Sequence, residues 1–438
     1  MTAFIKNRIG TGLVVLLAII PAVIWVSIEP LGPRLFSVPA ALISIGQVSG
    51  LVGMALFSLV IILSSRIKLL DNIFWGLNKV YVSHHNLGAI SFSLLLLHPS
   101  ALAVKYALAS VQTAFNFIIA DNPVTLLGEA SLLIMMFLLI LTFFSKLPYE
   151  KWKFTHKFLG LAFILGSIHS LMVYSDISKS QTLRGYMIIL GLLAVSSILY
   201  RSIFHKFLVK KYDYAVEEVK EISANTAEIT MSAKGERMEF EPGQFIFIKF
   251  EDDSVGREIH PFSMSSPPQE DNLKIVVKAL GDFTGRLKLL KKGTEARIEG
   301  PFGKFSYKNY PGGKKQIWIA GGIGATPFLS MAKSLGGGAD SGDYEIDFYY
   351  CANKKEELYF LGDLMKISEA RGNFRVIPFC SDEKGTITAN FVNKQSGGVG
   401  GKEIFICGPM LMMKSLEEQF LKLGAKGQGI HYEEFKLY

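Results

Sequence analysis

The first half of this 438-residue chain contains six long apolar stretches, which constrain its fold more than any other feature. A chain needs about 20 predominantly apolar residues to cross the hydrocarbon core of a bilayer as an α-helix. The sequence therefore predicts six membrane-spanning helices, at about residues 10–28, 41–65, 80–104, 125–145, 154–174 and 184–204. The first stretch is long enough to span, and we interpret it as a retained helix rather than a cleaved signal peptide.

Lysine and arginine are distributed unevenly between the segments that connect these stretches. Most of them lie before the first stretch and after the second, fourth and sixth. The alternate connections contain only Arg34, Lys105, Lys179 and Arg184. Because cytoplasmic loops are enriched in basic residues, we expect a multi-pass protein of the cell membrane with both termini in the cytoplasm.

The net charge of the chain is +8 at pH 7, a value that could also suit a nucleic-acid-binding protein. Much of the basic excess flanks the apolar stretches, so we expect the lipid bilayer as a partner and no nucleic acid. The three cysteines, Cys351, Cys380 and Cys407, all lie in the polar C-terminal half. Their odd number predicts a reducing compartment rather than a disulfide framework.

Two of the apolar stretches carry two histidines each. His84 and His98 are 14 residues apart on the third stretch, and His156 and His169 are 13 residues apart on the fifth. Such steps span roughly 20 Å of helix. The third and fifth helices should run in the same direction, so the histidines pair by depth. Neutral imidazole is a good axial ligand of haem iron, and we predict one b-type haem between His84 and His156 and another between His98 and His169.

The two spacings differ in helical geometry. At about 100° per residue, a 14-residue step returns nearly to the same face, but a 13-residue step does not. We therefore expect a bend or a π-bulge in the fifth helix, with Gly160 and Gly166 as candidate positions. His85 is an alternative ligand, but the pattern His-x-x-Leu-Gly, shared by residues 84–88 and 156–160, favours His84.

The second half of the chain contains two different patterns. Short strands separated by glycine, proline and acidic turns are expected at 226–231, 244–250, 273–279 and 295–299, which predicts an antiparallel barrel. From about Gln316, strands alternate with helices, which predicts a parallel sheet. We expect three domains, at residues 1–211, 212–312 and 313–438.

The barrel region contains the sequences His-Pro-Phe-Ser and Gly-Asp-Phe-Thr, with a lysine between them. A flavin needs an aromatic surface, hydrogen-bond donors at its ring edge and groups that hold a pyrophosphate. Phe262 and Ser263 could supply the first two, and Lys278 with the Gly281–Thr284 turn could supply the third. The turn at residues 300–303 could close the barrel beside the flavin. The expected flavin-binding residues are His260, Pro261, Phe262, Ser263, Lys278, Gly281, Asp282, Phe283 and Thr284.

A buried strand then leads through a glycine-rich turn directly into a helix at residues 317–327. Close backbone approach and a helix N-terminus favour a phosphate there. A second strand ends at Cys407, a position that places this residue beside a bound nicotinamide; as an alternative it is only a small buried side chain. The expected nucleotide-binding residues are Gly321, Gly322, Gly324, Thr326, Pro327, Cys407, Gly408 and Pro409.

These motifs, in this order, resemble the ferric reductase/NADPH oxidase superfamily, and the chain looks like a bacterial NADPH-oxidase-like transmembrane flavocytochrome b. The resemblance covers nearly the whole chain. It implies a six-helix bis-haem bundle followed by a ferredoxin-reductase-like module that binds FAD and NADPH or NADH. It also implies that Phe435 is the aromatic residue on the flavin and acts in catalysis with Cys407. Tyr438 is a competing candidate, because the chain continues three residues beyond Phe435.

The function that follows is electron transfer from cytoplasmic NAD(P)H, through FAD and two haems, to a small-molecule acceptor outside the membrane. The acceptor is either dioxygen, which gives superoxide, or ferric iron. Lys354 and Lys355 follow the second strand of the nucleotide sheet, which slightly favours NADPH. The alternatives are a subunit that reduces a partner protein and a membrane haem sensor or channel.

Overall fold

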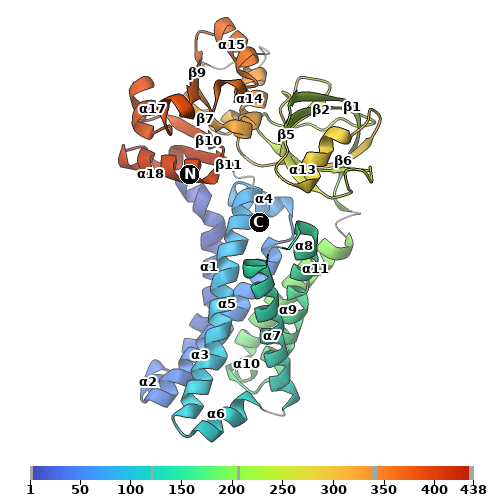
Figure 1. Ribbon diagram of the computed structural model, residues 1–438. Helices are drawn as coiled ribbons and strands as arrows, with labels where there is room; N and C mark the ends of the chain where they lie inside the picture. Colours follow the sequence, from blue (N-terminus) through green and yellow to red (C-terminus); the bar gives the residue numbers. More distant parts are fainter. Residues whose placement is uncertain (1–2, 120–121, 146, 205–207, 337–342, 434–438) are drawn as a thin grey trace. The chain divides into compact units, whose positions relative to one another are not determined.

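The computed structural model describes residues 3–119, 122–145, 147–204, 208–336 and 343–433 (Figure 1). The chain divides into two compact units, which are described separately. The helical unit contains residues 8–74 and 79–206, and the other unit contains residues 1–7, 75–78 and 207–438.

The helical unit contains long apolar helices and short connecting ones. Its elements are α1 (Ala3–Ile28), α2 (Leu31–Leu35), α3 (Val38–Leu63), α4 (Lys68–Phe74), α5 (Leu77–Ala107), α6 (Val111–Ile118), α7 (Pro123–Phe144), α8 (Tyr149–His156), α9 (Leu159–Met172), α10 (Asp176–Lys179), α11 (Gln181–Leu199) and the π-helical η1 (Tyr200–Phe204). Within the described residues, five helices are long and apolar enough to cross a membrane: Ile9–Ile28 of α1, α3, α5, α7, and Gln181–Phe204. These correspond to five of the six predicted spans.

The remaining predicted span, 154–174, is divided in two. α8 ends at His156, Lys157 and Phe158 form a turn, and α9 begins at Leu159. The irregularity predicted from the 13-residue step is therefore present, two residues before Gly160, and Gly166 lies within regular helix. α9 has 14 residues, about 21 Å of helix, which is too short to span a bilayer alone. It packs beside α7, α3 and α11 (Figure 1).

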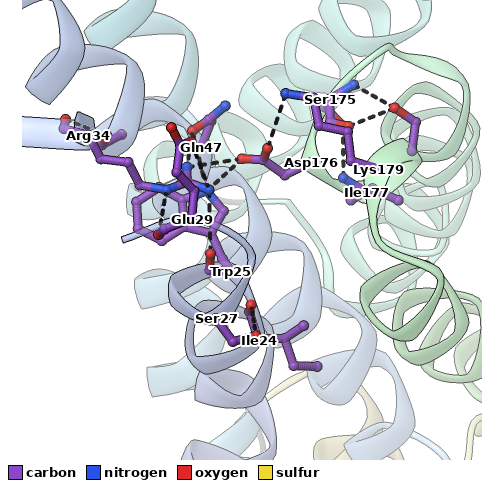
Figure 2. A network of polar contacts seen from close by, with 12 residues as sticks. Ile24, Trp25, Ser27, Glu29, Arg34, Gln47, Ser175, Asp176, Ile177 and Lys179 are labelled. Atoms are coloured by element: carbon purple, nitrogen blue, oxygen red, sulfur yellow. Dashed lines mark hydrogen bonds and ion pairs between the residues drawn. The ribbon is translucent and has the colours of Figure 1, made fainter. Parts of the chain in front are cut away.

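A buried polar network joins α1, α2, α3 and α10 (Figure 2). The Arg34 side chain lies 3.1 Å from Asp176, and both side chains are 5% exposed. The Trp25 indole nitrogen also donates to Asp176, at 2.8 Å, and the Arg34 guanidinium lies 3.7 Å from the centre of the Trp25 ring. Arg34 also donates to the Gln47 side chain at 3.1 Å. Because a buried charge needs its partner, these contacts hold the short helices α2 and α10 to the bundle.

The first sheet of the second unit has six antiparallel strands in the order β4-β3-β6-β1-β2-β5. The strands are β1 (Lys211–Ser223), β2 (Thr226–Ala233), β3 (Phe245–Phe250), β4 (His260–Ser263), β5 (Leu273–Lys278) and β6 (Glu295–Phe302). The four predicted strands correspond to β2, β3, β5 and β6. β1 was missed because it is rich in charged residues, and β4 because it has only four residues and contains Pro261. A short helix, α13 (Asp282–Arg286), follows β5.

The second sheet has five parallel strands in the order β11-β10-β7-β8-β9. Its strands are β7 (Lys315–Gly321), β8 (Glu345–Ala352), β9 (Phe374–Cys380), β10 (Glu403–Cys407) and β11 (Ile430–Glu433). The helices that follow β7 are α14 (Thr326–Gly336), α15 (Leu361–Ala370), α16 (Ser381–Lys384), α17 (Ala389–Gln395) and α18 (Met410–Lys422). The 3-10 turns of the whole unit are η2 (Leu287–Leu289) and η3 (Tyr307–Asn309), which precede β7, and η4 (Gly322–Ala325), η5 (Lys355–Glu357) and η6 (Gly427–Gly429), which follow it. This confirms the predicted parallel sheet and adds β11, too short to recognise in the sequence. Separate apolar clusters cover the two faces, one around Trp318 and the other around Tyr349.

Candidate functional site

The rings of His84 and His156 face each other in the helical unit. His84 lies within α5, His156 is the last residue of α8, and their ring centroids are 6.2 Å apart at an angle of 60°. A metal ion about 2 Å from one nitrogen of each ring would separate the centroids by roughly 6 Å. The observed separation therefore fits an iron held between the two imidazoles.

Three of the four predicted ligands are oriented by a backbone carbonyl of a neighbouring helix. His84 Nδ1 lies 2.8 Å from the Val60 oxygen, His98 Nδ1 2.7 Å from the Gly46 oxygen, and His169 Nδ1 2.7 Å from the Val124 oxygen. A carbonyl only accepts hydrogen bonds, so each Nδ1 carries the proton and each Nε2 keeps its lone pair. Second hydrogen bonds of this kind accompany metal-bound histidines. The residues present therefore fit the predicted haems.

The surroundings of His156 and His85 differ from those of the three histidines above. His156 Nδ1 is buried and has no hydrogen-bond partner among the described residues, and its ring packs against Trp152 at 5.2 Å between centroids. His85 is exposed and contacts the ring of Phe143, at 6.1 Å between centroids. His84 and not His85 thus lies opposite His156. His98 and His169 lie near enough to each other for their charged forms to repel.

The two motifs predicted to bind the flavin meet in the first sheet. The His260 ring at the start of β4 stacks on the Phe283 ring of α13 at 4.0 Å, and His260 Nε2 lies 2.8 Å from the Glu258 carboxylate. Phe283 itself belongs to the apolar core of the first sheet. The Thr284 hydroxyl is used within its own turn, where it accepts from the Leu280 and Gly281 amides. This turn can therefore offer a pyrophosphate its backbone more readily than its hydroxyl.

Two buried hydroxyl groups mark the other end of β4. The Ser263 and Ser265 Oγ atoms are buried and have no hydrogen-bond partner among the described residues. Burying such groups unpaired costs free energy, so a ligand that bonds to them would remove this cost. The residues present therefore fit a polar ring edge such as that of a flavin. Ser263 was predicted from the sequence and Ser265 was not, since it lies beyond the motif.

The nucleotide turn connects β7 to α14 through η4, as the sequence predicted. Gly322 has a φ of +55°, and a side chain there would meet no atom within 4 Å, so its surface is open. Gly324 is different, because an added Cβ would lie only 2.3 Å from the Cys407 carbonyl oxygen. The Thr326 hydroxyl donates to the Ile323 carbonyl at 2.7 Å, and Pro327 is buried in the first turn of α14.

The ends of β7 and β10 therefore lie in contact, with Gly321 and Gly324 against Cys407 and Gly408. Cys407 is fully buried, and burial, with the nearby Glu433 carboxylate, raises the pKa of its thiol well above the usual value. The side chain is thus a neutral, enclosed group, and only its backbone borders the turn. Pro409 follows at the start of α18, against Gly321.

The end of β11 approaches the end of β6 in the first sheet. Glu433 is 4% exposed, and an added Cβ at Gly303, the residue after β6, would lie 3.8 Å from its carboxylate. The prediction of a turn at residues 300–303 is wrong, because residues 300–302 belong to β6; Gly303, directly after this strand, is close to the C-terminal strand. Glu433 was not singled out as a site residue in the sequence. Phe435 and Tyr438 lie outside the described residues.

Three family models match successive parts of the chain. A model described as the ferric reductase like transmembrane component matches residues 49–167, an FAD-binding domain matches 211–306, and an oxidoreductase NAD-binding domain matches 318–418. The second covers the first sheet, and the third covers most of the second sheet but not β11. The first covers much of the helical unit, including three of the paired histidines.

Individual proteins show more limited similarity. The glycine betaine monooxygenase reductase subunit of Chromohalobacter salexigens is 28% identical over 45% of this chain and 56% of its own length. Dual oxidase 2 of Rattus norvegicus is 28% identical over 37% of this chain and 12% of its own length. The chain spans about half the length of the curated relatives it matches. The flavohemoglobin of Malassezia yamatoensis, solved with FAD and haem, shares the fold with a TM-score of 0.52 at 16% identity, over 89% of this chain and 97% of that one.

The chain is therefore a membrane oxidoreductase with a transmembrane ferric-reductase component, an FAD-binding domain and an NAD(P)H-binding domain. It belongs to the ferric reductase/NADPH oxidase family of flavocytochromes.

Proposed function

We propose that this protein passes electrons from NAD(P)H in the cytoplasm, through FAD and two b-type haems, to dioxygen or ferric iron on the opposite side of the cell membrane. When bound, FAD accepts a hydride and the haems carry single electrons. The observation that carries the proposal is the arrangement of the histidines in two pairs, with three Nδ1 atoms bound to carbonyls and the Nε2 atoms left available.

Each part of the chain has a separate role in this proposal. In the domain of residues 1–211, α8 and α9 together cross the membrane once, which brings the number of crossings to six. Both termini of the chain lie in the cytoplasm. His84 and His156 hold the haem nearer the cytoplasm, and His98 and His169 hold the outer haem. The Nδ1 hydrogen bonds of His84, His98 and His169 keep these three rings from turning away from the iron that each would hold.

The domain of residues 212–312 binds FAD. Ser263 and Ser265 hydrogen-bond to the flavin ring edge, and Phe262 supplies an apolar surface. The backbone of Gly281–Thr284 and the Lys278 ammonium hold the pyrophosphate. Phe435, with Tyr438 as the alternative, supplies an aromatic surface for the flavin.

The domain of residues 313–438 binds the nicotinamide cofactor. The open surface of Gly322 lets the pyrophosphate approach the start of α14, and the Cys407–Gly408–Pro409 turn borders the nicotinamide. Lys354 and Lys355 are exposed after β8, where they favour the 2′-phosphate of NADPH. This charge is balanced by neighbouring Glu356 and Glu357, so the preference for NADPH over NADH should be small.

A second function is favoured by the names of several relatives. The Chromohalobacter salexigens relative is named a reductase subunit, and a Pseudomonas putida relative an electron transfer component of a dioxygenase. By analogy, this chain would reduce a partner protein. A membrane haem sensor or channel is a more distant alternative.

Steady-state turnover of the purified protein tests these functions together. The haem content is first measured from the absorbance of the reduced protein, and two haems per chain are expected. Superoxide and ferrous iron are then assayed with NADH and NADPH in turn. Turnover of dioxygen or ferric iron supports the proposal. Reduction of the haem and the flavin without turnover of either acceptor would favour the subunit that reduces a partner protein. Absence of haem would favour neither of these two functions.

A further inference from the structure

Two glycines of neighbouring helices lie against the rings of His98 and His169. At Gly50 of α3, an added Cβ would lie 2.9 Å from His98 Nδ1. At Gly128 of α7, an added Cβ would lie 2.9 Å from His169 Nδ1. A carbon atom cannot pack this closely against a ring nitrogen, so only glycine allows the two rings to occupy these positions.

The same helices provide the hydrogen-bond acceptors of these rings. His98 Nδ1 bonds to the carbonyl of Gly46, and His169 Nδ1 to the carbonyl of Val124. Each acceptor lies four residues before the glycine. The carbonyl of residue i in an α-helix already accepts the amide of residue i+4, but its second lone pair can accept another donor.

The geometry of a helix explains why the residue at i+4 matters. Each Cα–Cβ bond is tilted toward the N-terminus of the helix, so the side chain at i+4 covers the carbonyl at i. A glycine at i+4 leaves this carbonyl accessible from the side. Gly50 thereby exposes the Gly46 carbonyl, and Gly128 exposes the Val124 carbonyl.

His84 and His156 have different surroundings from His98 and His169. His84 bonds to Val60, in the last turn of α3, where carbonyls lack a helical partner. His156 Nδ1 has no partner among the described residues. The nearby Gly88 would bring its Cβ only to ordinary contact, 3.6 Å from the Val60 side chain. The combination of a glycine and the carbonyl four residues before it therefore distinguishes His98 and His169 within the described part of the bundle.

We propose that Gly50 and Gly128 are positioning residues that set the orientation and the ligand strength of His98 and His169. By exposing one carbonyl each, they fix the Nδ1 proton and direct Nε2 toward the space between the two rings. A hydrogen bond at Nδ1 makes Nε2 a stronger donor to the metal, which favours ferric over ferrous haem and lowers its midpoint potential. This inference rests on the proposed function, since it requires a haem between His98 and His169.

Gly50→Ala and Gly128→Ala test the proposal in the full-length protein with its cofactors bound. The readouts are a redox titration of the two haems and the EPR spectrum of the ferric protein, which depends on the orientation of the axial imidazoles. In each variant we expect a change in the haem between His98 and His169. Its midpoint potential should shift upward and its EPR signal should change, or this haem should be lost selectively. The other haem and the flavin of the same molecule should be unchanged.

Gly191→Ala in α11 is the matched control, because an added Cβ there would meet no atom within 4 Å. It makes the same change of residue type within an apolar helix and should leave both haems unchanged. Gly10→Ala adds a control for steric clash, since its Cβ would lie 2.6 Å from the Phe74 ring and touch no histidine. Because Gly50 and Gly128 lie on different helices, the result does not depend on the folding of a single variant.

A selective change in one haem supports the proposal. Unchanged potentials and spectra in both variants would overturn it, as would equal disturbance of both haems, which would indicate general packing. In either case the wild-type protein would still contain two haems, so the proposed function would stand. A wild-type protein without two bis-imidazole haems would refute the proposed function and this inference with it.

Discussion

His84 and His156 come from different helices, yet their ring centroids lie 6.2 Å apart. This separation depends on the interruption of the fifth apolar stretch at Lys157 and Phe158, because His156 lies on α8 whereas His169 lies on α9. A continuous helix would place the two histidines of this stretch on different faces. The turn between α8 and α9 is thus what allows one stretch to serve two ligand pairs.

Replacement of the buried serines tests the flavin site. If the Ser263 hydroxyl bonds to bound FAD, Ser263→Ala should weaken FAD binding by about tenfold, the effect of losing one hydrogen bond of roughly 1.4 kcal/mol. The dissociation constant can be measured by fluorescence titration of protein stripped of flavin. Ser254→Ala, at an exposed serine that bonds to Asp252, is the control. Unaltered affinity together with increased stability of Ser263→Ala would show that this hydroxyl is simply unpaired and meets no ligand.

Two glycines of the nucleotide turn should respond differently to substitution. Gly322→Ala should raise the Michaelis constant for NAD(P)H several-fold with little effect on folding, because the side chain enters open space and its positive φ costs only about 1 kcal/mol. Gly324→Ala should instead destabilise the domain, since its Cβ collides with the Cys407 carbonyl. Thermal unfolding and steady-state kinetics separate these effects. Similar behaviour of the two variants would argue against this distinction.

The Arg34–Asp176 pair should contribute strongly to the stability of the bundle. Asp176→Ala leaves the buried Arg34 with only the more exposed Glu29 carboxylate, at 3.7 Å, and we expect a loss of about 3 kcal/mol in the free energy of unfolding. Lys179→Ala removes an exposed partner of the same carboxylate and should cost less than about 1 kcal/mol. Unfolding of the detergent-solubilised proteins provides the measurement. Equal losses would mean that burial of the pair has no special importance.

The cysteines should be unreactive in the folded protein. Burial raises the pKa of Cys351 to about 12 and also raises those of Cys380 and Cys407. At pH 8 a thiol with a pKa of 12 is ionised to only about one part in 10⁴, and the thiolate is the reactive form. By mass spectrometry, iodoacetamide should therefore modify Cys351 and Cys407 at least about 100-fold more slowly than in unfolded protein, and Cys380 more slowly as well. Rapid modification of Cys407 would show that its thiol is accessible.

The sequence predicted features that depend on composition and spacing. The apolar stretches predicted the long helices, the 13-residue step predicted the break beside His156, and strand–turn–helix alternation predicted the parallel sheet. Charged β1 was missed because its pairing with β2 and β6, rather than its own side chains, stabilises it. The Ser265 hydroxyl, unpaired within the described residues, and the contacts of Gly50 and Gly128 depend on other parts of the chain, and no local pattern reveals them.

The role of Phe435 can be separated from that of Tyr438 by two variants. If Phe435 covers the flavin, Phe435→Ala should change the flavin absorbance and the rate of hydride transfer, because an aromatic surface is lost. A chain truncated after Phe435 should behave nearly like the full-length protein. Absorbance spectra and stopped-flow reduction by NADPH provide the measurements. The reverse pattern would assign the stacking role to Tyr438.

The most direct test of the two-haem path is anaerobic rapid mixing of the His169→Ala protein with NADPH. His169 is held by the Val124 carbonyl and is expected to ligate only the haem that it shares with His98. We expect the flavin and the haem at His84 and His156 to be reduced as in the wild-type protein, while reduction of the external acceptor collapses. His156→Ala is the matched variant, in which the flavin should be reduced but any remaining haem only very slowly. Near-normal acceptor turnover by His169→Ala would contradict the proposed path of electrons through both haems.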